Sequence, residues 1–175
     1  MKPYIFIDRD DTLIYDVPYL NEPERVKLTP GAGRTLAKLR EKGFGVIVIS
    51  NQSGIGRGII TLEQLNAVNM RMKELLAADG CELDDIFFCP HKPTDNCPCR
   101  KPRTGMLEQA CAKYAVDLRH SVMVGDSQGD IDMGKAFGLK TVQIRLPELN
   151  KPDAMADCTA SCLEDAYSFI CGLIE

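Results

Sequence analysis

Acidic residues that directly follow an apolar run are the first chemical signal in this sequence. The run IFI at residues 5–7 leads into DRDD at residues 8–11, and a second pair of acids, Asp126 and Asp130, lies in the string GDSQGD. Carboxylates within a few ångströms of one another repel, and each raises the pKa of the other unless a cation is present. The sequence therefore predicts a cation close to residues 8–11.

A hydroxyl group and a lysine add to this acidic set. Ser50 follows the apolar run VIVI, and Lys101 lies in the string CRKP. An oxygen-rich acidic cluster suits Mg²⁺, which prefers carboxylates, water and substrate phosphate as ligands. Lysine and hydroxyl groups suit the oxygens of a phosphoryl group in transfer, and a carboxylate can attack phosphorus to form an aspartyl-phosphate. One aspartate after a strand is more often a turn former, but the whole set favours phosphoryl transfer.

A second group of metal-ligand side chains lies in the string CPHKPTDNCPCRKP. Three thiols and an imidazole within eleven residues form a Cys₃His set, which is common in closed structural zinc sites: Cys89, His91, Cys97 and Cys99. Chance cysteines in a loop or a disulfide are the alternatives, and the ligand types and their crowding favour zinc. Cys99 is followed directly by Arg100 and Lys101, so a metal bond to Cys99 would anchor this basic pair.

Short β-branched runs alternate with helical periodicity along the chain. This pattern predicts one α/β domain over residues 1–175, with a Rossmann-like doubly wound parallel sheet covered by helices. In such a sheet, ligands bind beyond the carboxyl ends of the strands, where the acidic groups and Ser50 would converge. The predicted strands are Tyr4 to Ile7, Val46 to Ser50, Asp85 to Cys89, Val122 to Gly125 and Thr141 to Ile144.

Helix boundaries are signalled by cap residues. Thr29, followed by a proline, is predicted to cap the first long helix, and Thr61 with a glutamine three residues later predicts a capping box. The last helix is expected from an apolar pattern that starts at Leu163 and ends at Ile174. Residues 150–153, NKPD, are interpreted as only a turn before that helix.

Composition excludes several classes of protein. The net charge of −4 and the pI of about 5.3 give no electrostatic footprint for nucleic acid. No apolar run approaches the roughly 20 residues that span a bilayer, and the N-terminus lacks the apolar stretch of a signal peptide. We therefore expect a cytoplasmic protein that binds neither nucleic acid nor membrane. The five cysteines outside the string CPHKPTDNCPCRKP are expected to be reduced: Cys81, Cys111, Cys158, Cys162 and Cys171.

The strings DRDDT, VIVISNQSG, CRKP and VGDSQGD resemble, in this order, the four motifs of the haloacid dehalogenase-like (HAD-like) phosphatases. The resemblance implies that Asp8 is the nucleophile and that Asp10 is the general acid and base. It also implies that Ser50 and Lys101 hold the phosphoryl oxygens. It places Mg²⁺ on Asp8, the backbone carbonyl of Asp10 and Asp126, with Asp130 in supporting contact.

The cysteine spacing narrows this resemblance. C-x-H followed by C-x-C resembles the zinc loop of a capless subgroup that includes bacterial heptose bisphosphate phosphatases and the phosphatase half of histidine-biosynthesis enzymes. The intervals between the motifs leave no room for an inserted lid domain. Asp11 departs from the glycine usual in close relatives, but aspartate tolerates unusual backbone angles, so we expect an effect on the flap at residues 13–19 and no loss of activity.

Cations beyond Lys101 decide the expected substrate. Arg57, Arg100 and Arg103 suit a second, non-reacting phosphate, because arginine binds phosphate bidentately. The strings NQSGIGRG and CRKPRTGM also resemble the heptose subgroup more closely than the histidinol one. The resemblance and the arginines together imply removal of the 7-phosphate of D-glycero-D-manno-heptose 1,7-bisphosphate by a monomeric enzyme, with histidinol phosphate as the alternative substrate. Ser127 stands where the heptose enzymes often carry a basic residue. The expected substrate-binding residues are Asp16, Tyr19, Asn51, Gln52, Ser53, Arg57, Arg100, Lys101 and Ser127.

Two other classes of function remain as alternatives. A phospho-acceptor signalling module of the receiver type also places acids, a hydroxyl and a lysine at parallel strand ends, but its acceptor follows the third strand. A zinc-dependent nucleic-acid binder is disfavoured by the acidic pI. Turnover of a generic phosphate ester separates an enzyme from both.

Overall fold

One parallel sheet of six strands organises the molecule. The computed structural model describes residues 1–175, and the strand order is β3-β2-β1-β4-β5-β6, with every neighbouring pair parallel. This is the order of a doubly wound Rossmann-like sheet, as predicted. The strands are β1 (Tyr4–Ile7), β2 (Gly45–Asn51), β3 (Asp85–Cys89), β4 (Val122–Gly125), β5 (Lys140–Ile144) and β6 (Cys158–Ala160).

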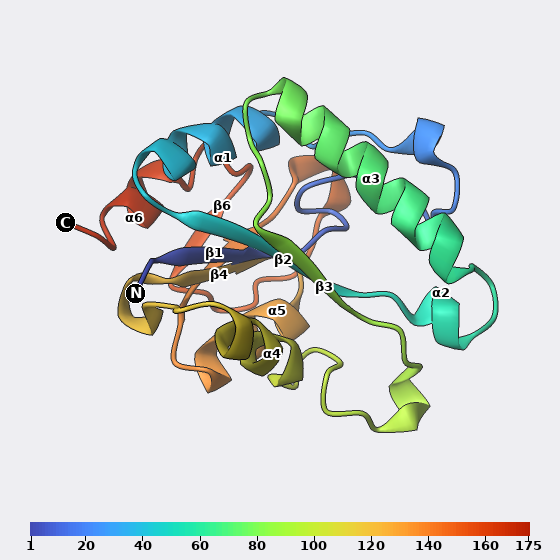
Figure 1. Ribbon diagram of the computed structural model, residues 1–175. Coiled ribbons are helices and arrows are strands. Elements are labelled where there is room, and N and C mark those ends of the chain that lie inside the picture. The colour runs from blue at the N-terminus through green and yellow to red at the C-terminus, as the bar shows by residue number, and fades with distance from the viewer.

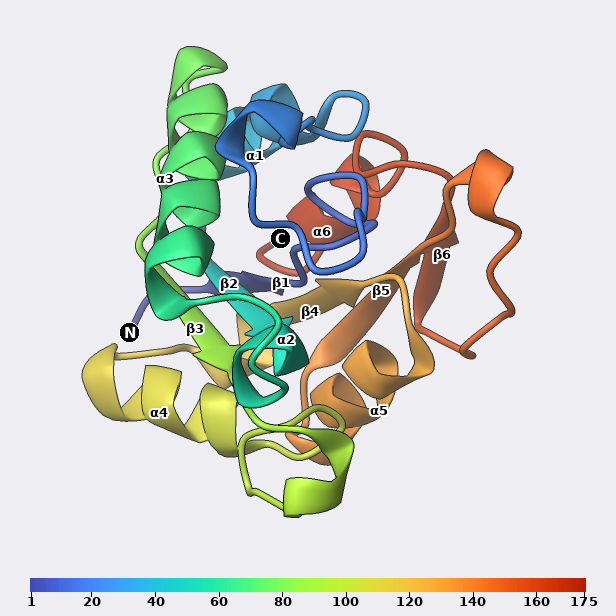
Figure 2. The same ribbon diagram turned by 90° about the vertical axis from the view of Figure 1, so that its right-hand side faces the viewer.

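Helices cover both faces of the sheet (Figure 1). One face carries α1 (Ala32–Glu41), α3 (Leu62–Ala78) and α6 (Tyr167–Cys171), and the other carries α4 (Gly105–Lys113) and α5 (Gln128–Ala136). A short helix, α2 (Ser53–Gly56), follows β2 at the carboxyl edge of the sheet (Figure 2). Short 3-10 helices span Pro23–Arg25, Pro93–Asp95, Leu118–His120 and Pro147–Leu149.

Two apolar cores, one on each face, hold these layers together. Leu36 and Val68 join the larger core, and Met106 and Met133 join the smaller one. Strand β1 is buried along its whole length because its side chains feed both cores. Continuous apolar strands of this kind are typical of the interior of a parallel sheet.

The strand register aligns the carboxyl ends of the central strands. Ile7 pairs with Val48 of β2 and with Val124 of β4, so the residues that follow these three strands emerge at one edge. The flap segment, the 3-10 helix Pro23–Arg25 and α1 are all that lies between β1 and β2, and only α2 and α3 lie between β2 and β3. The chain therefore has no cap domain inserted at these points.

Both chain ends lie at the opposite, amino-terminal edge of the sheet (Figure 1). Pro3 and Ile174 line a common pocket together with Gly43, which precedes β2. None of the helices combines the length and the apolar character needed to cross a bilayer.

The predicted elements are confirmed with four corrections. The capping box of Thr61 and Gln64 is present, but Thr29 is not the cap of α1. Its hydroxyl donates instead to the carbonyls of Thr12 and Leu13, and Gly31, in the left-handed region at φ 71°, takes the cap position.

The other three corrections concern short elements. The chain forms β6 at residues 158–160, and the last helix is confined to residues 167–171. Residues 53–56, for which no helix was predicted, form α2. Elements of three to five residues carry too few side chains to produce a clear period.

Candidate active site

The ends of β1, β2 and β4 place three predicted site residues at one edge of the sheet. Asp8 directly follows β1 and its backbone N–H donates to the carbonyl of Val124. Ser50 lies near the end of β2, and Asp126 directly follows β4. All three side chains are buried, and Asp8 is only 7% exposed.

Lys101 reaches the same point from the loop between β3 and α4. Its Nζ lies 2.5 Å from Asp8 Oδ1 and 2.6 Å from Asp130 Oδ1, and it donates to the carbonyl of Ile49. The side-chain oxygen of Asn51 accepts from the backbone N–H of Lys101 at 3.1 Å. The lysine is thus fixed at both its backbone and its ammonium group.

Asp8, Asp126 and Asp130 form a compact set of carboxylates. One oxygen of each lies within 4.8 Å of the others. An oxygen-only donor set of this size fits a hard divalent cation such as Mg²⁺. The carboxylate of Asp10 lies outside this set, and the predicted contact of its backbone carbonyl with the cation stays a prediction.

The charges around this set are unbalanced. Asp8 and Asp126 line a cavity of about 170 Å³, which is lined in all by five carboxylates, two lysines and no apolar side chain. Burial raises the pKa of Asp8 well above its usual range; Lys101 opposes this shift, and the carboxylates of Asp130 and Asp126 add to it. A divalent cation would offset the excess negative charge and favour the ionised form of Asp8.

Asp10 is held by Arg9, which the sequence did not single out, and by Gln52, which it predicted among the substrate-binding residues. Arg9, only 2% exposed, donates to both oxygens of Asp10 at 3.1 and 3.2 Å and to the side-chain oxygen of Asn69 at 3.0 Å. Gln52 Nε2 donates to Asp10 Oδ2 at 2.9 Å and to Ser50 Oγ at 2.8 Å. A charged residue beside a buried strand was the only signal for Arg9, and nothing in the sequence linked it to Asn69.

Lys151 is the second residue that was missed, and interpreting residues 150–153 as only a turn was incomplete. Its Nζ pairs with Asp126 Oδ2 at 2.7 Å and with Asp11 Oδ2 at 3.1 Å. Burial opposes the positive charge, but the hydrogen bonds and charges of Asp126 and Asp11 prevail and raise the pKa of Lys151. The one available signal was that Lys151 follows a strand whose carboxyl end points to the same edge.

The flap lies over a second cavity that adjoins the first. Asp16, Tyr19, Gln52 and Ser53 line this cavity of about 280 Å³, and Asp16, Asp10 and Asn51 line both cavities. Burial raises the pKa of Asp16, and the nearby carboxylates of Asp10 and Asp11 add to the shift. The first two residues of the predicted flap, Leu13 and Ile14, are buried in the core, so its exposed part begins later.

Glycines in α2 let three segments approach closely. A Cβ on Gly54 would lie 2.9 Å from the ring of Tyr19, and a Cβ on Gly56 would lie 2.6 Å from the carbonyl oxygen of Pro90. The N–H of Gly56 donates to that carbonyl at 2.9 Å. Helix α2 therefore connects the flap to the cysteine-rich loop.

The remaining predicted substrate-binding residues differ in how far their side chains are occupied. Arg57 is exposed at the end of α2, and Arg100 is half-buried with one hydrogen bond, at 3.4 Å, to the carbonyl of His91. Arg103 donates at 2.6 Å to both Cys97 O and Asn96 Oδ1, so it braces the loop. Ser127 is exposed and its hydroxyl donates to Asp130, capping α5.

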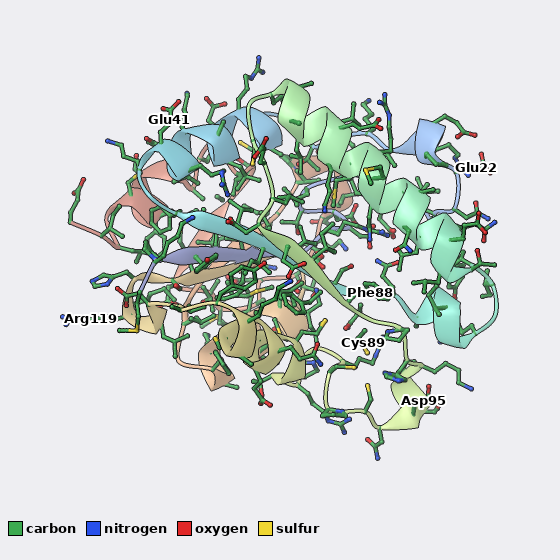
Figure 3. All side chains as sticks on the ribbon, in the orientation of Figure 1. Glu22, Glu41, Phe88, Cys89, Asp95 and Arg119 are labelled. Carbon is green, nitrogen blue, oxygen red and sulfur yellow. The ribbon has the colours of Figure 1, made fainter.

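The four zinc-ligand candidates converge in the loop that follows β3. Figure 3 shows Cys89 at the end of that strand and Asp95 at the far end of the loop. One ligand atom from each of the four lies within 4.8 Å of the others, and the sulfur–sulfur separations are 3.0 to 3.5 Å. A disulfide would require about 2.05 Å, whereas sulfur and nitrogen donors at these separations fit a tetrahedral zinc ion. The candidates are Cys89, His91, Cys97 and Cys99.

The thiols of this cluster differ in acidity. Burial raises the pKa of Cys89, with the Cys99 thiol adding to the shift, to about 12. Burial also acts on Cys97, but the thiols of Cys89 and Cys99 lower its pKa to about 7. The thiolate is the form of cysteine that binds metal, so zinc binding would displace the protons of the three thiols.

We expect Cys97→Ser to lower the zinc content of the purified protein well below the roughly one ion per chain that a closed site binds. Loss of the metal would loosen the loop, and its three cysteines would pack less firmly against Met106 and Leu107 in the smaller core. Arg100 and Lys101 would then move, raising KM and lowering kcat. Elemental analysis and steady-state kinetics measure these effects.

Cys111→Ser is the matched control, because this half-buried cysteine lies on α4 outside the cluster. It should keep the zinc content of the parent protein. Metal-free parent protein with full activity would contradict the proposed role of the cluster.

Comparisons with known proteins agree with this geometry. A family model described as HAD-hydrolase-like matches residues 98–158. The chain is 41% identical over 128 residues to the probable D-glycero-D-manno-heptose-1,7-bisphosphate 7-phosphatase of Thermoplasma volcanium, covering 73% of this chain and 87% of that protein. It is 36% identical over 173 residues to the D-glycero-beta-D-manno-heptose-1,7-bisphosphate 7-phosphatase of Yersinia pestis, covering 93% and 92%. The histidine biosynthesis bifunctional protein of Legionella pneumophila is also 36% identical, but this chain spans only 42% of its length.

A solved structure extends the agreement to three dimensions. The D,D-heptose 1,7-bisphosphate phosphatase of B. bronchiseptica, crystallised with magnesium and phosphate, superposes with a TM-score of 0.85 at 30% identity. The match covers 96% of this chain and 97% of that one. With relatives this similar over most of its length, the chain belongs to the heptose-1,7-bisphosphate 7-phosphatase family of HAD-like phosphatases.

Proposed function

We propose that this chain, acting as one domain over residues 1–175, is an Mg²⁺-dependent phosphatase that removes the 7-phosphate of D-glycero-D-manno-heptose 1,7-bisphosphate and leaves the 1-phosphate. The observation that carries this proposal is the pairing of buried Asp8 with Lys101 at 2.5 Å. This pair lies in an acidic cavity that adjoins a second cavity below the flap. The first cavity suits the reacting phosphoryl group, and the second suits the sugar.

The chemistry follows from which residues line each cavity. A carboxylate oxygen of Asp8 attacks phosphorus, the bond from phosphorus to the sugar oxygen breaks, and Asp10 donates a proton to that oxygen. Asp10 lines both cavities, so it lies at their boundary, where the oxygen that joins the phosphoryl group to the sugar would be. In the second step Asp10 takes a proton from water, whose oxygen attacks phosphorus and releases Asp8.

Lys101 and the divalent cation would offset the negative charge of the phosphoryl group. The ammonium group of Lys101 offsets negative charge on the oxygens that surround phosphorus. Asp8, Asp126 and Asp130 are the residues that would hold Mg²⁺, which supplies further neutralisation of those oxygens. Ser50 would add a hydrogen bond from its buried hydroxyl.

The proposed substrate depends on a second anion site. The guanidinium groups of Arg57 and Arg100 form no ion pair with a carboxylate, and they lie on segments that contact each other through Gly56 and Pro90. Both can therefore turn to a non-reacting phosphate, which arginine binds bidentately. Arg103 is withdrawn from this role because its hydrogen bonds brace the loop. Histidinol phosphate carries an amine in place of the second phosphate.

We expect kcat/KM for the heptose bisphosphate to exceed that for histidinol phosphate by roughly ten- to a hundredfold or more, if one charge-assisted contact contributes about 1.5 to 3 kcal/mol. Arg57→Ala and Arg100→Ala should each reduce this ratio and leave turnover of p-nitrophenyl phosphate nearly unchanged. Arg119→Ala is the control, since Arg119 is exposed and lies at the far end of the molecule (Figure 3). Equal or faster hydrolysis of histidinol phosphate would overturn the substrate assignment.

A further inference from the structure

Lys151 adds a connection between the segments that follow β1 and β4, and it comes from outside the four motifs. Its ammonium group bridges Asp126, which follows β4, and Asp11, which follows β1, at 2.7 and 3.1 Å. Asp11 and Asp126 are buried, and the side chain of Lys151 is one-third exposed. One cation from the segment after β5 therefore holds two carboxylates in fixed positions.

The segment that carries Lys151 is itself held in place. Gln143, only 1% exposed, donates from Nε2 to the carbonyls of Asp126 and Pro152 and accepts from the N–H of Ala154. Arg145 Nε donates to the carbonyl of Lys151 at 2.9 Å. Because one buried amide bonds both this segment and the backbone of Asp126, the position of Lys151 relative to Asp126 is set by the fold.

Asp11 completes the connection on the other side. Its backbone is in the left-handed region at φ 57°, and both carboxylate oxygens are in use. Oδ1 accepts from the N–H of Asp16 at 2.9 Å, and Oδ2 pairs with Lys151. A glycine at this position would allow the same backbone angle but could bond neither group.

The contact with Asp126 concerns the metal. Lys151 pairs with Oδ2 of Asp126 at 2.7 Å, and Asp126 also belongs to the carboxylate set that could hold a cation with Asp8 and Asp130. Hydrogen bonds from outside a metal site orient its carboxylate ligands, and losing such a partner typically costs 10- to 100-fold in metal affinity. An ammonium group that merely occupied the place of the cation would have the opposite effect, because its removal would strengthen metal binding.

We infer that Lys151 is a positioning residue for the divalent-cation site, that Asp11 holds its ammonium group, and that the pair also fixes the start of the flap. This inference rests on the proposed function for the identity of the cation. It assigns a purpose to the aspartate that stands at position 11 and to a lysine that lies outside the four motifs.

The test is a calorimetric Mg²⁺ titration of the purified full-length protein without substrate. We expect Lys151→Met to weaken Mg²⁺ binding by roughly 10- to 100-fold, Lys151→Arg to retain most of the affinity, and Asp11→Asn to show a smaller loss. The Mg²⁺ concentration for half-maximal activity should rise in parallel, with kcat at saturating Mg²⁺ less affected. Lys140→Met is the matched control, because Lys140 is an exposed lysine on β5 that pairs with Asp157.

Mg²⁺ binding by Lys151→Met as tight as, or tighter than, that of the parent protein would overturn the inference. Asp11→Asn is an independent variant. Unchanged Mg²⁺ affinity in both Lys151→Met and Asp11→Asn would show that the pair does not position the cation site. The proposed function fails separately: parent protein that binds Mg²⁺ but does not hydrolyse the heptose bisphosphate would reject the substrate, while the binding series would still decide the role of Lys151.

Discussion

Asp8→Asn is expected to reduce turnover of every phosphate ester to background while the protein remains folded. The amide has nearly the same shape as the carboxylate but cannot attack phosphorus, so no aspartyl-phosphate can form. Burial raises the pKa of Asp8, with the carboxylates of Asp130 and Asp126 adding to this and Lys101 opposing it. Removing the charge therefore relieves repulsion, and the melting temperature should not fall. Steady-state kinetics and a thermal melt give the two readouts.

Mass spectrometry of acid-quenched reactions adds a direct check on this prediction. The parent protein should carry a labile phosphoryl group, and the variant should carry none. Asp132→Asn is the matched control, because Asp132 is exposed on α5 and its carboxylate only accepts from Gln128. Near-normal turnover by Asp8→Asn would reject Asp8 as the nucleophile.

Asp10→Asn is expected to slow hydrolysis of the sugar phosphate by roughly 10² to 10⁴-fold, the usual contribution of general acid–base catalysis. A sugar alkoxide is a poor leaving group and requires a proton, whereas nitrophenolate does not. With p-nitrophenyl phosphate, the variant should therefore release a burst of about one nitrophenolate per enzyme before the slow hydrolysis of the intermediate. Rapid-mixing absorbance measurements detect this burst.

An equal loss of rate in the formation and in the hydrolysis of the aspartyl-phosphate, with both the sugar phosphate and p-nitrophenyl phosphate, would count against this role of Asp10. Arg9 and Gln52 bond the carboxylate of Asp10 from the side, so a general collapse of the site is the competing cause of such a loss. Preserved Mg²⁺ affinity in Asp10→Asn would exclude collapse, since the carboxylate of Asp10 lies outside the cluster that would hold the cation.

The sheet and its polar edge could be predicted from the sequence because their signals are local. Each strand is a short apolar run, and parallel strands direct whatever follows them to one edge. The placement of Asp8 next to Asp126 required no more than this rule. The cysteine cluster was equally accessible, since its four ligand candidates lie within one short loop.

What could not be predicted depends on contacts between distant segments. The pairing of Arg9 with Asn69 joins β1 to a helix sixty residues away, and Lys151 reaches Asp11 from a segment whose path is set by Gln143. Neither pairing leaves a periodic pattern in the sequence. Thr29 illustrates a local signal with two outcomes, because a threonine before a proline can cap a helix or, as here, bond neighbouring carbonyls.

The position of the two chain ends has a practical consequence. Both lie at the amino-terminal edge of the sheet, where Pro3 and Ile174 share a pocket, whereas Asp8 and the flap lie at the opposite edge. A second polypeptide joined covalently at either end would therefore attach on the side remote from the cavities, and substrate could still enter. The domain is thus suited to fusion with other enzymes, to circular permutation through a short linker between its ends, and to surface immobilisation with its catalytic edge facing the solution.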